Sequence, residues 1–304
     1  MQEGYKSAAT VLCGRLGESL LSVPREIREK TEEIRLRAGR PPALTVAGEI
    51  YFLESGGKVQ KESGGVAVLG EAELKEAVKN ICEGSVYSHL SEITSGFISM
   101  PHGNRAGIIG SFCEGRFCVA SSINIRIARE IPNAAVELIK GYKGGSVLIC
   151  GPPGSGKTTY LRSLVRGVSE GEGGRSYRIS LIDSRGEIAA LCSGVPTLEV
   201  GVNTDVFAGR DKAEAIEAAI RSMSPEIIAL DEIGGERELA AVKSGMYCGA
   251  YVFASAHLES VAAINRRSVI RELLEAGDFS YFVFLNALKK ARIYEIKNGE
   301  ICGL

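Results

Sequence analysis

The sequence lacks any apolar run that could cross a bilayer as a helix. Such a span needs at least ~18 apolar residues, and the longest stretches here, YVFASA and FSYFVFLNAL, are much shorter. The N-terminal segment also lacks a sustained apolar stretch and carries an early acidic residue, so we expect no secretory signal. The sequence therefore predicts a protein that does not span a membrane by itself.

Closely spaced cysteines are also absent. The eight cysteines form no CxxC pair and stand singly among apolar residues. Zinc sites and disulfide-rich folds use cysteines at short, regular spacings, so we expect neither a zinc site nor a disulfide framework. We predict reduced thiols that pack as small core residues in a cytoplasmic protein.

The sequence also lacks a large excess of either positive or negative charge. The chain carries 36 basic and 37 acidic side chains, for a formal net charge of -1. A protein that binds polyanions over its whole surface has a strongly basic balance, and this chain does not. The sequence also shows no evident sheet surface of basic and aromatic residues, although the composition leaves room for a local basic patch.

The pattern along the chain changes near residue 130. A chain of 304 residues exceeds the usual size of one hydrophobic core, so two domains are expected. Residues 1–130 mix a charged helical segment at 24–36, a helix at 71–84 and several short strand-like runs, which predicts a smaller α+β domain. Residues 131–304 alternate apolar strand-like runs with helical segments, which predicts an α/β domain with a mostly parallel sheet.

Five apolar runs supply the expected strands of the second domain, at 146–150, 178–183, 226–231, 250–256 and 281–287. Near the end of the chain, an Asn-Gly pair separates two alternating runs. Asn-Gly is favoured in tight hairpin turns, so the sequence predicts a terminal β-hairpin.

The strongest motif is a phosphate-binding loop, GPPGSGKT, which runs from Gly151 to Thr158. A strand-like run precedes it and a helical segment follows it, as the GxxxxGK[ST] motif requires. Glycines let backbone N–H groups converge on phosphate oxygens, and the following helix N-terminus adds partial positive charge. In this interpretation Lys157 pairs with the β- and γ-phosphates of ATP and the Thr158 hydroxyl binds Mg²⁺; a simple glycine-rich turn is the alternative. The candidate nucleotide-binding residues are Gly151, Pro152, Pro153, Gly154, Ser155, Gly156, Lys157, Thr158 and Thr159.

Two acidic residues end another apolar strand, in EIIALDEIGG. Asp231 is the candidate metal ligand beside Thr158, and Glu232 is the candidate catalytic residue that orients or deprotonates the attacking water. Successive acids at the end of a buried strand are costly without a cation. This cost favours a magnesium site over a carboxylate that is merely hydrogen-bonded.

A third strand, in RISLIDSRGE, lies between these two motifs in the sequence and also runs into acidic residues. Asp183 and Glu187 are therefore candidate catalytic carboxylates, although Asp183 could instead cap the turn that follows it. An additional strand between the phosphate loop and the second acidic strand is typical of the RecA-like branch of P-loop proteins.

The order of four motifs resembles that of the secretion and type IV pilus ATPases: GPPGSGKTT, IDSRGE, LDEIGG and SAHLES. Further segments over most of the chain are similar to the stage III sporulation protein AA family: EIRLRAGRPP, GFISMPHGNRAGIIG, SSINIRIA, GVNTDVFAG and IRSMSPEIIALDEIGG. The resemblance implies a RecA-like ATPase that forms a homo-oligomeric ring, a hexamer. It also implies a cytoplasmic position at the inner face of a membrane, where the ring energises a secretion-like sporulation complex of membrane proteins between mother cell and forespore.

The resemblance also bears on one histidine and two arginines. His257 follows an apolar strand, and the family's histidine at this place approaches the terminal phosphate of the nucleotide; a buried core histidine is the alternative. Ligands of open α/β sheets bind at the carboxyl ends of strands, which favours the role of phosphate sensor. Arg105 and Arg126, in the N-terminal domain, are implied as catalytic candidates that neutralise phosphate charge, with a solvated or salt-bridged arginine as the alternative.

Together, these patterns predict a Mg²⁺-dependent ATP hydrolase with a RecA-like domain. Two alternatives stay open: a RecA-like motor that moves nucleic acid, and a scaffold that binds nucleotide with little turnover. The near-neutral net charge disfavours nucleic acid as a partner. Glu232 disfavours the scaffold, because its position suits a residue of the hydrolysis step.

Overall fold

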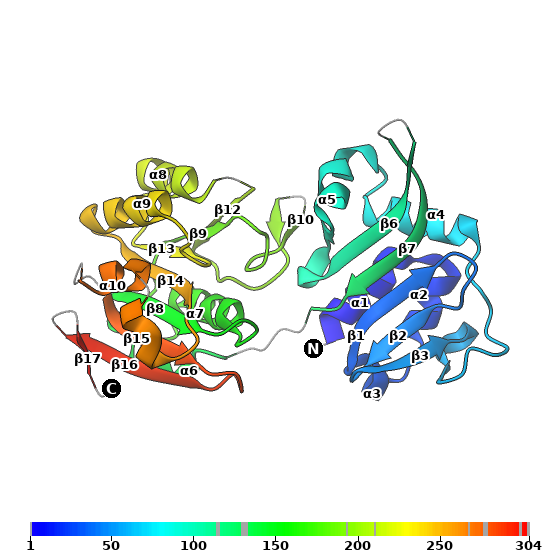
Figure 1. Ribbon diagram of the computed structural model, residues 1–304, viewed down its shortest axis with the longest axis horizontal. Helices are drawn as coiled ribbons and strands as arrows, with labels where there is room; N and C mark the ends of the chain where they lie inside the picture. Colours follow the sequence, from blue (N-terminus) through cyan, green and yellow to red (C-terminus); the bar gives the residue numbers. More distant parts are fainter. Residues whose placement is uncertain are drawn as a thin grey trace. The chain divides into compact units, whose positions relative to one another are not determined.

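The computed structural model of the chain describes residues 2–113, 116–128, 133–192, 194–209, 211–266, 268–275, 279–297 and 300–302. They form two compact units, one of residues 1–130 and 190–198 and the other of residues 131–189 and 199–304 (Figure 1). The expected domain boundary at 130–131 lies outside the described residues. Residues 190–198, which we expected in the second domain, group with the first unit.

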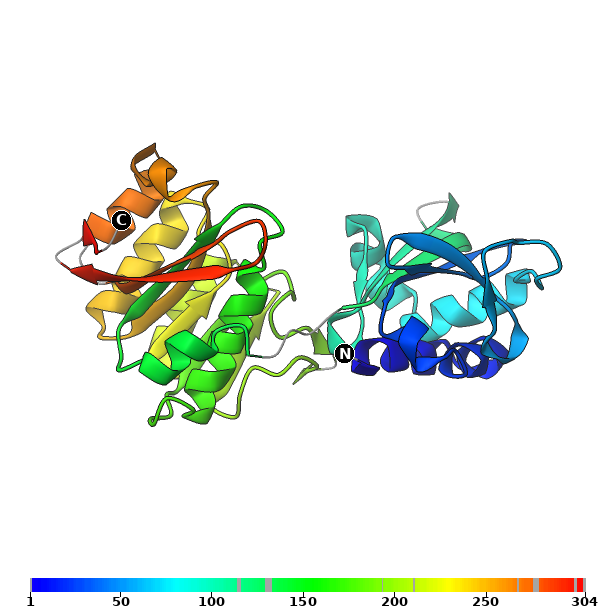
Figure 2. The ribbon, with the colours of Figure 1, turned by 90° about the horizontal axis from the view of Figure 1, so that it is seen from below.

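The first unit is built on a seven-stranded sheet in the order β4-β3-β2-β1-β7-β6-β5, and each neighbouring pair is antiparallel. Its strands are β1 (Thr31–Arg37), β2 (Ala43–Val46), β3 (Glu49–Leu53), β4 (Val59–Gln60), β5 (Ile98–Ser99), β6 (Arg105–Cys113) and β7 (Arg116–Arg126). One face of this sheet is covered by helices (Figure 2), chiefly α1 (Gln2–Leu12), α2 (Gly14–Leu21) and α4 (Glu71–Ile81). The shorter helices are α3 (Arg25–Arg28) and α5 (Leu90–Ser95), and residues 190–198 add a small antiparallel pair, β10 (Leu191–Cys192) and β11 (Val195–Pro196).

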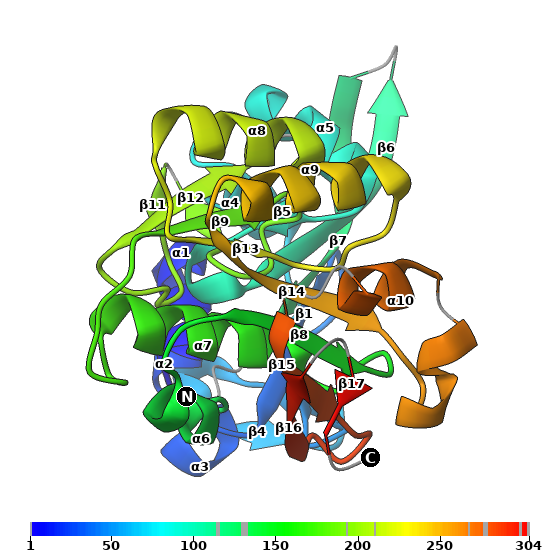
Figure 3. The same cartoon turned by 90° about the vertical axis from the view of Figure 1, so that its left-hand side faces the viewer.

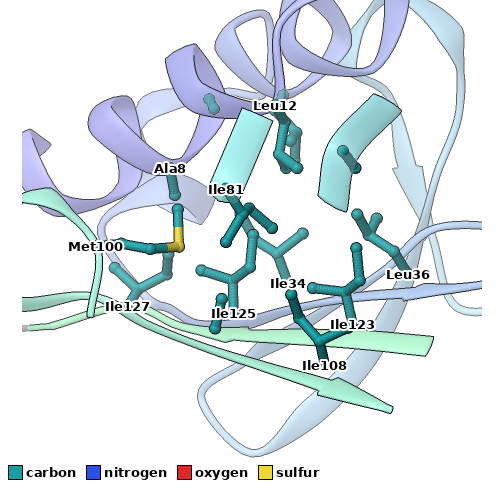
Figure 4. Close-up of a cluster of buried hydrophobic side chains, with 14 of the residues drawn as sticks. Ala8, Leu12, Ile34, Leu36, Ile81, Met100, Ile108, Ile123, Ile125 and Ile127 are labelled. Atoms are coloured by element: carbon teal, nitrogen blue, oxygen red, sulfur yellow. The ribbon is translucent and has the colours of Figure 1, made fainter. Parts of the chain in front are cut away.

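The alternation of side chains in β1 decides which face of the sheet meets the helices. Ile34 and Leu36 are buried in a core where isoleucines of β6 and β7 meet side chains of α1 and α4 (Figure 4). Arg35 and Arg37 alternate with them and therefore lie on the opposite face. The helix predicted at 24–36 is wrong beyond α3, because this period-two pattern favours a strand that pairs with β2 and β7.

The second unit is built on an eight-stranded sheet in the order β12-β9-β13-β14-β8-β15-β16-β17. The strands are β8 (Ser146–Gly151), β9 (Ile179–Asp183), β12 (Thr204–Ala208), β13 (Ile227–Leu230), β14 (Tyr251–His257), β15 (Phe279–Leu285), β16 (Ala291–Lys297) and β17 (Glu300–Ile301). The first six strands of that order are parallel, and β16 and β17 are added antiparallel. The expected α/β class is confirmed, and its sheet is mixed.

Helices cover both faces of this second sheet (Figure 3). On one face lie α6 (Val136–Gly141) and α7 (Lys157–Glu170), and on the other lie α8 (Lys212–Ser222), α9 (Glu236–Tyr247) and α10 (Ser268–Glu275). Among the described helices, none has the length and apolar character that a bilayer crossing requires.

The burial of the central strands explains why their sequences are continuous apolar runs. Every residue of β8, β9 and β13 is buried, as expected for parallel strands covered on both faces. β8, β13 and β14 run parallel to one another, so their carboxyl ends lie at the same edge of the sheet. The predicted terminal hairpin is confirmed by the pairing of β16 with β17, while its Asn298–Gly299 turn lies outside the described residues.

The cysteines only partly follow the prediction that they are core residues. Four of the described free thiols are exposed, which corrects the prediction for Cys13, Cys118, Cys248 and Cys302. Cys82 and Cys150 are buried. Burial raises the pKa of the Cys82 thiol to about 11 and that of the Cys150 thiol to about 12, so both stay protonated at neutral pH.

Candidate nucleotide site

The phosphate loop joins the end of β8 to the start of α7. Gly151 ends β8, and a Cβ at this position would lie 2.5 Å from the carbonyl oxygen of Leu285, so a larger residue does not fit there. Gly156 precedes α7 with a φ of 92°, in the left-handed region that favours glycine. The two glycines allow the strand–loop–helix path that the motif predicts, with the positive end of α7 at the loop.

A cavity of about 320 Å³ lies over this loop. The residues that border it include Lys157, Thr158, Glu187, Asp231, Glu232 and Lys289. In the loop itself, the Ser155 hydroxyl is buried and has no hydrogen-bond partner among the described residues. Ser155 is not among the described residues that border the cavity, whose lysines and helix N-terminus fit a ligand that carries phosphate groups.

Lys157 is held at the loop by the loop's own backbone. Its Nζ donates hydrogen bonds to the carbonyl oxygens of Gly151, at 3.0 Å, and Pro152, at 3.1 Å. Lys157 also borders the cavity. It can therefore exchange these carbonyl contacts for phosphate oxygens with little movement of the side chain.

Asp231 connects the three central strands. Thr158 Oγ1 donates to its Oδ2 at 3.1 Å, and Ser255 Oγ donates to its Oδ1 at 2.7 Å. Thr158 belongs to the helix after β8, Asp231 directly follows β13, and Ser255 lies in β14 between those two strands. Hydroxyl and carboxylate oxygens are the hard ligands that suit Mg²⁺, so Thr158 and Asp231 fit the expected metal site.

Glu232 is held by its backbone while its carboxylate borders the cavity. Its N–H donates to Ser255 Oγ at 3.0 Å, and its carbonyl oxygen accepts from Lys212 Nζ at 2.5 Å. Its φ is 34°, a conformation that costs of order 1–3 kcal/mol for a residue with a Cβ. The side chain is 44% exposed and one of its oxygens lies 3.8 Å from Arg185 Nη1. The surrounding contacts thus hold a strained backbone that keeps this carboxylate at the cavity.

Asp183 has the contacts of a turn cap. One of its oxygens accepts from the N–H of Glu187 at 2.8 Å, and the other accepts from the N–H groups of Ile188 and Ala189 at 3.1 and 2.8 Å. Arg162 of α7 donates to the carbonyl oxygens of Glu187 and Ile188 at 3.3 and 3.2 Å. The two buried charged residues fix the turn that brings Glu187 to the cavity.

His257 is the last residue of β14 and pairs in register with Gly151 of β8. β14 therefore separates the strand of the phosphate loop from β13, and its histidine stands at the edge where both motifs end. The His257 side chain is half-buried. It is not among the described residues that border the cavity.

Arg105 and Arg126 belong to the first unit, where they face each other across the β6–β7 pair. A hollow of about 390 Å³ on this open sheet face, here called the arginine pocket, is lined by Arg35, Arg37, Arg105 and Arg126. The guanidinium carbon of Arg105 lies 4.6 Å from the ring centroid of Phe97. The arginine pocket is a local basic patch of the kind that the composition left room for, and it forms because alternation on three paired strands gathers arginines from distant segments.

Glu33 is an acidic residue beside the arginine pocket. It accepts hydrogen bonds from Arg35 Nε at 2.8 Å and Asn124 Nδ2 at 3.4 Å, and lies 3.6 Å from Arg126 Nε. Burial alone would raise the pKa of Glu33, but these hydrogen bonds and the charges of Arg35 and Arg126 outweigh it and lower the pKa. Glu33 is thus charged at neutral pH, and it offsets one of the four arginine charges.

Besides Lys289, three residues of the nucleotide site were not singled out from the sequence. Ser255 lies two residues before His257, and the same-face rule for strands could have found it. Lys212 opens α8 and Arg185 follows β9, and both contact Glu232 after β13. No local pattern marks these two, since their partner comes from a distant segment.

Comparison with known proteins places the chain in a family. The family described as "Sporulation stage III, protein AA" matches residues 4–301. Stage III sporulation protein AA of Bacillus subtilis (strain 168) is 30% identical over 306 residues, which cover 96% of this chain and 95% of that protein. The protein SEEDLING PLASTID DEVELOPMENT 1 of Arabidopsis thaliana is 29% identical over 181 residues, which cover 56% of this chain and 26% of that protein.

Solved structures of pilus and secretion ATPases share the fold. The pilus retraction motor PilT with bound ADP aligns with a TM-score of 0.59 and 20% identity, over 86% of this chain and 76% of that chain. The ATPase DotB of Legionella pneumophila aligns with a TM-score of 0.53 and 17% identity, over 87% of this chain and 75% of that chain. The resemblance inferred from the motifs is thus confirmed, and the chain belongs to the sporulation stage III protein AA family.

Proposed function

We propose that the chain is a Mg²⁺-dependent ATP hydrolase that energises a secretion-like complex in sporulation. The observation that carries the proposal is the hydrogen bond of 3.1 Å between Thr158 Oγ1 and Asp231 Oδ2. It joins the helix of the phosphate loop to the acidic end of β13, so that a phosphate site and a cation site share one cavity. A glycine-rich turn that binds no nucleotide would not require this hydrogen bond between Thr158 and Asp231.

The binding step uses the loop and the two residues that would hold the metal. Lys157 and the backbone N–H groups at the start of α7 bind the phosphates of ATP. Thr158 and Asp231 would hold Mg²⁺, which neutralises phosphate charge when it is bound. Ser255 keeps Asp231 oriented through its hydrogen bond of 2.7 Å.

Glu232 is the proposed general base of the hydrolysis step. It accepts a proton from water while the water oxygen bonds to the γ-phosphorus and the bond from that phosphorus to the bridging oxygen breaks, which leaves ADP and phosphate. Its carboxylate is partly exposed at the cavity. Asp183 is a weaker candidate, because its two oxygens accept three backbone hydrogen bonds. Glu187, which borders the same cavity, is the next candidate.

A ring assembly is the second part of the proposal. In a ring, the arginine pocket of one subunit serves the phosphates bound in another, and Arg105 and Arg126 neutralise the charge that develops during hydrolysis. His257, at the edge where the phosphate loop begins, reports the presence of the γ-phosphate. Family membership and the shared fold support a cytoplasmic ring at a membrane, bound to membrane proteins of the sporulation complex.

One feature of the arginine pocket favours the alternative of a nucleic-acid motor. Four arginines on a sheet face could bind a strand of phosphates. However, the guanidinium group of Arg105 packs over the aromatic ring of Phe97. The Phe97 side chain therefore contacts an arginine and is not a free surface on which a base can stack. Stimulation of ATP hydrolysis by single-stranded DNA or RNA, in a salt-dependent manner, would favour that alternative over the secretion motor.

Calorimetric titration with ATP tests the proposed function. Lys157→Ala should abolish ATP binding, because it removes the cation of the phosphate loop. Lys243→Ala is the matched control, since Lys243 is a half-buried lysine of α9 whose partner is Glu272 and which is not among the described residues bordering the cavity. The control should bind ATP as the parent does. Unchanged ATP affinity of Lys157→Ala would overturn the assignment of the loop.

A further inference from the structure

The turn that follows β15 is fixed by its own hydrogen bonds. Asn286 Oδ1 accepts from the N–H groups of Leu288 and Lys290, each at 3.0 Å. The N–H of Asn286 donates to the Lys290 carbonyl oxygen at 3.1 Å, and the N–H of Lys289 donates to the Asn286 carbonyl oxygen at 2.9 Å. Four hydrogen bonds within five residues therefore set the direction in which each side chain of this turn leaves the backbone.

Lys289 sits in this turn with a φ of 60°. The left-handed region favours glycine or asparagine over a lysine. The chain thus keeps a cationic side chain at a position where its own backbone favours another residue. Strained positions of this kind gather at functional sites.

Strand pairing places this turn beside the phosphate loop. β15 runs parallel to β8, with Phe284 opposite Cys150, so both strands end at the same edge of the sheet. A Cβ placed on Gly156 would lie 4.0 Å from Lys289 Cγ. Lys289 accordingly borders the same cavity as Lys157 and Thr158.

The charges of the cavity are divided between its two sides. In the sheet order, β14 and β13 lie on one side of β8, and β13 leads into the carboxylates of Asp231 and Glu232. β15 lies on the other side of β8 and leads into the turn with Lys289. Lys289 is thus a cation on the side of the loop away from the residues that would hold the metal, where it adds to the positive end of α7.

We propose that Lys289 is a second phosphate-binding lysine, which contacts the phosphates that ADP and ATP have in common. This inference rests on the proposed nucleotide function. It extends that function by a residue outside the phosphate loop, held in place by the Asn286 turn. Its position against Gly156, at the start of α7, is the reason to expect a contact with both nucleotides and no selectivity for the γ-phosphate.

Affinities for ADP and for ATP, measured by calorimetry on the full chain, test this inference. Lys289→Asn removes the charge and leaves a residue that tolerates the left-handed conformation, so the melting temperature without nucleotide should not fall. The affinities for both nucleotides should drop about tenfold, as for the loss of one charged hydrogen bond. Lys289→Arg, which keeps the charge, should retain most of the affinity.

Lys290→Asn is the matched control, because Lys290 is an exposed lysine of the same turn that is not among the described residues bordering the cavity. If Lys289→Asn binds both nucleotides as Lys290→Asn does, while Lys157→Ala has lost binding, the inference is wrong and the nucleotide function stands. If Lys157→Ala also keeps its affinity, the proposed function itself fails. A loss with Lys289→Asn that is confined to ATP would overturn the assignment to the shared phosphates.

Discussion

Ser255 Oγ donates a hydrogen bond of 2.7 Å to Asp231 Oδ1. The same hydroxyl accepts a hydrogen bond of 3.0 Å from the N–H of Glu232. Ser255 is fully buried in β14, so water does not compete for either contact. One hydroxyl therefore orients both acidic residues that follow β13, Asp231 through its carboxylate and Glu232 through its backbone.

Ser255→Ala should weaken ATP hydrolysis more than nucleotide binding. The substitution leaves a carboxylate oxygen of Asp231 and the N–H of Glu232, two half-buried residues, without their shared partner. We expect the Mg²⁺ concentration that gives half of the maximal rate to rise, because Asp231 is no longer held in place. The rate as a function of Mg²⁺ concentration measures this effect.

Ser180→Ala is the control for that experiment. Ser180 is a buried serine of β9 whose hydroxyl has no hydrogen-bond partner among the described residues. Its replacement should leave both the Mg²⁺ dependence and the melting temperature close to those of the parent. Equal behaviour of the two alanine variants would contradict the role given to Ser255.

Glu232→Gln should bind ATP normally and hydrolyse it slowly. The amide keeps the shape of the side chain but does not accept the proton of water, and a general base contributes roughly 10²- to 10⁴-fold to the rate. Single-turnover hydrolysis and ATP affinity, measured side by side, separate the two effects. If this variant hydrolyses at the parent rate, the base is Glu187 or Asp183, and loss of activity in Glu187→Gln would identify Glu187.

His257→Ala should change the ratio of ATP to ADP affinity. A histidine that contacts the γ-phosphate contributes to ATP binding alone, by roughly 1.5–3 kcal/mol for a hydrogen bond to a charged group. ADP affinity should barely change. A buried core histidine predicts the opposite result: a lower melting temperature, and equal losses for both nucleotides.

Mixing two inactive variants tests whether subunits share a site. Arg126→Ala should lower hydrolysis by roughly 10³-fold, if the arginine neutralises phosphate charge as such residues do elsewhere. In a ring, a Glu232→Gln subunit can lend its intact arginine pocket to the nucleotide of an Arg126→Ala subunit. Mixtures should therefore regain part of the activity that neither variant has alone. No recovery at any mixing ratio would place Arg126 outside the shared site.

Alkylation at pH 8 should divide the cysteines by burial. Cys13, Cys118, Cys248 and Cys302 are exposed and should react with iodoacetamide in the folded protein. Cys82 and Cys150 should react after denaturation, because burial raises their thiol pKa values to about 11 and about 12. Peptide mass spectrometry reads out each position, and rapid labelling of Cys150 would contradict the packing of β8.

For contiguous patterns, the sequence predicted the local backbone structure well. The phosphate loop, the strand before it and the helix after it are adjacent in the chain, so their spacing alone indicates how they fold. The acidic pair Asp231–Glu232 follows a strand whose apolar residues mark it as central. Asp183 was harder to interpret, since the same acidic residue after a strand suits either a catalytic group or the turn cap that its hydrogen bonds show.

The sequence by itself determined the family, the α/β class of the second unit and the strand–loop–helix path of residues 146–170, because each is encoded in local order and periodicity. The tertiary structure decided which distant residues meet. Ser255 reaches Asp231 because β14 lies between β8 and β13, and the arginine pocket forms because β1, β6 and β7 pair with their arginines on one face. Such contacts depend on strand order and register, which involve hydrogen bonds between segments far apart in the chain and leave no local pattern in the sequence.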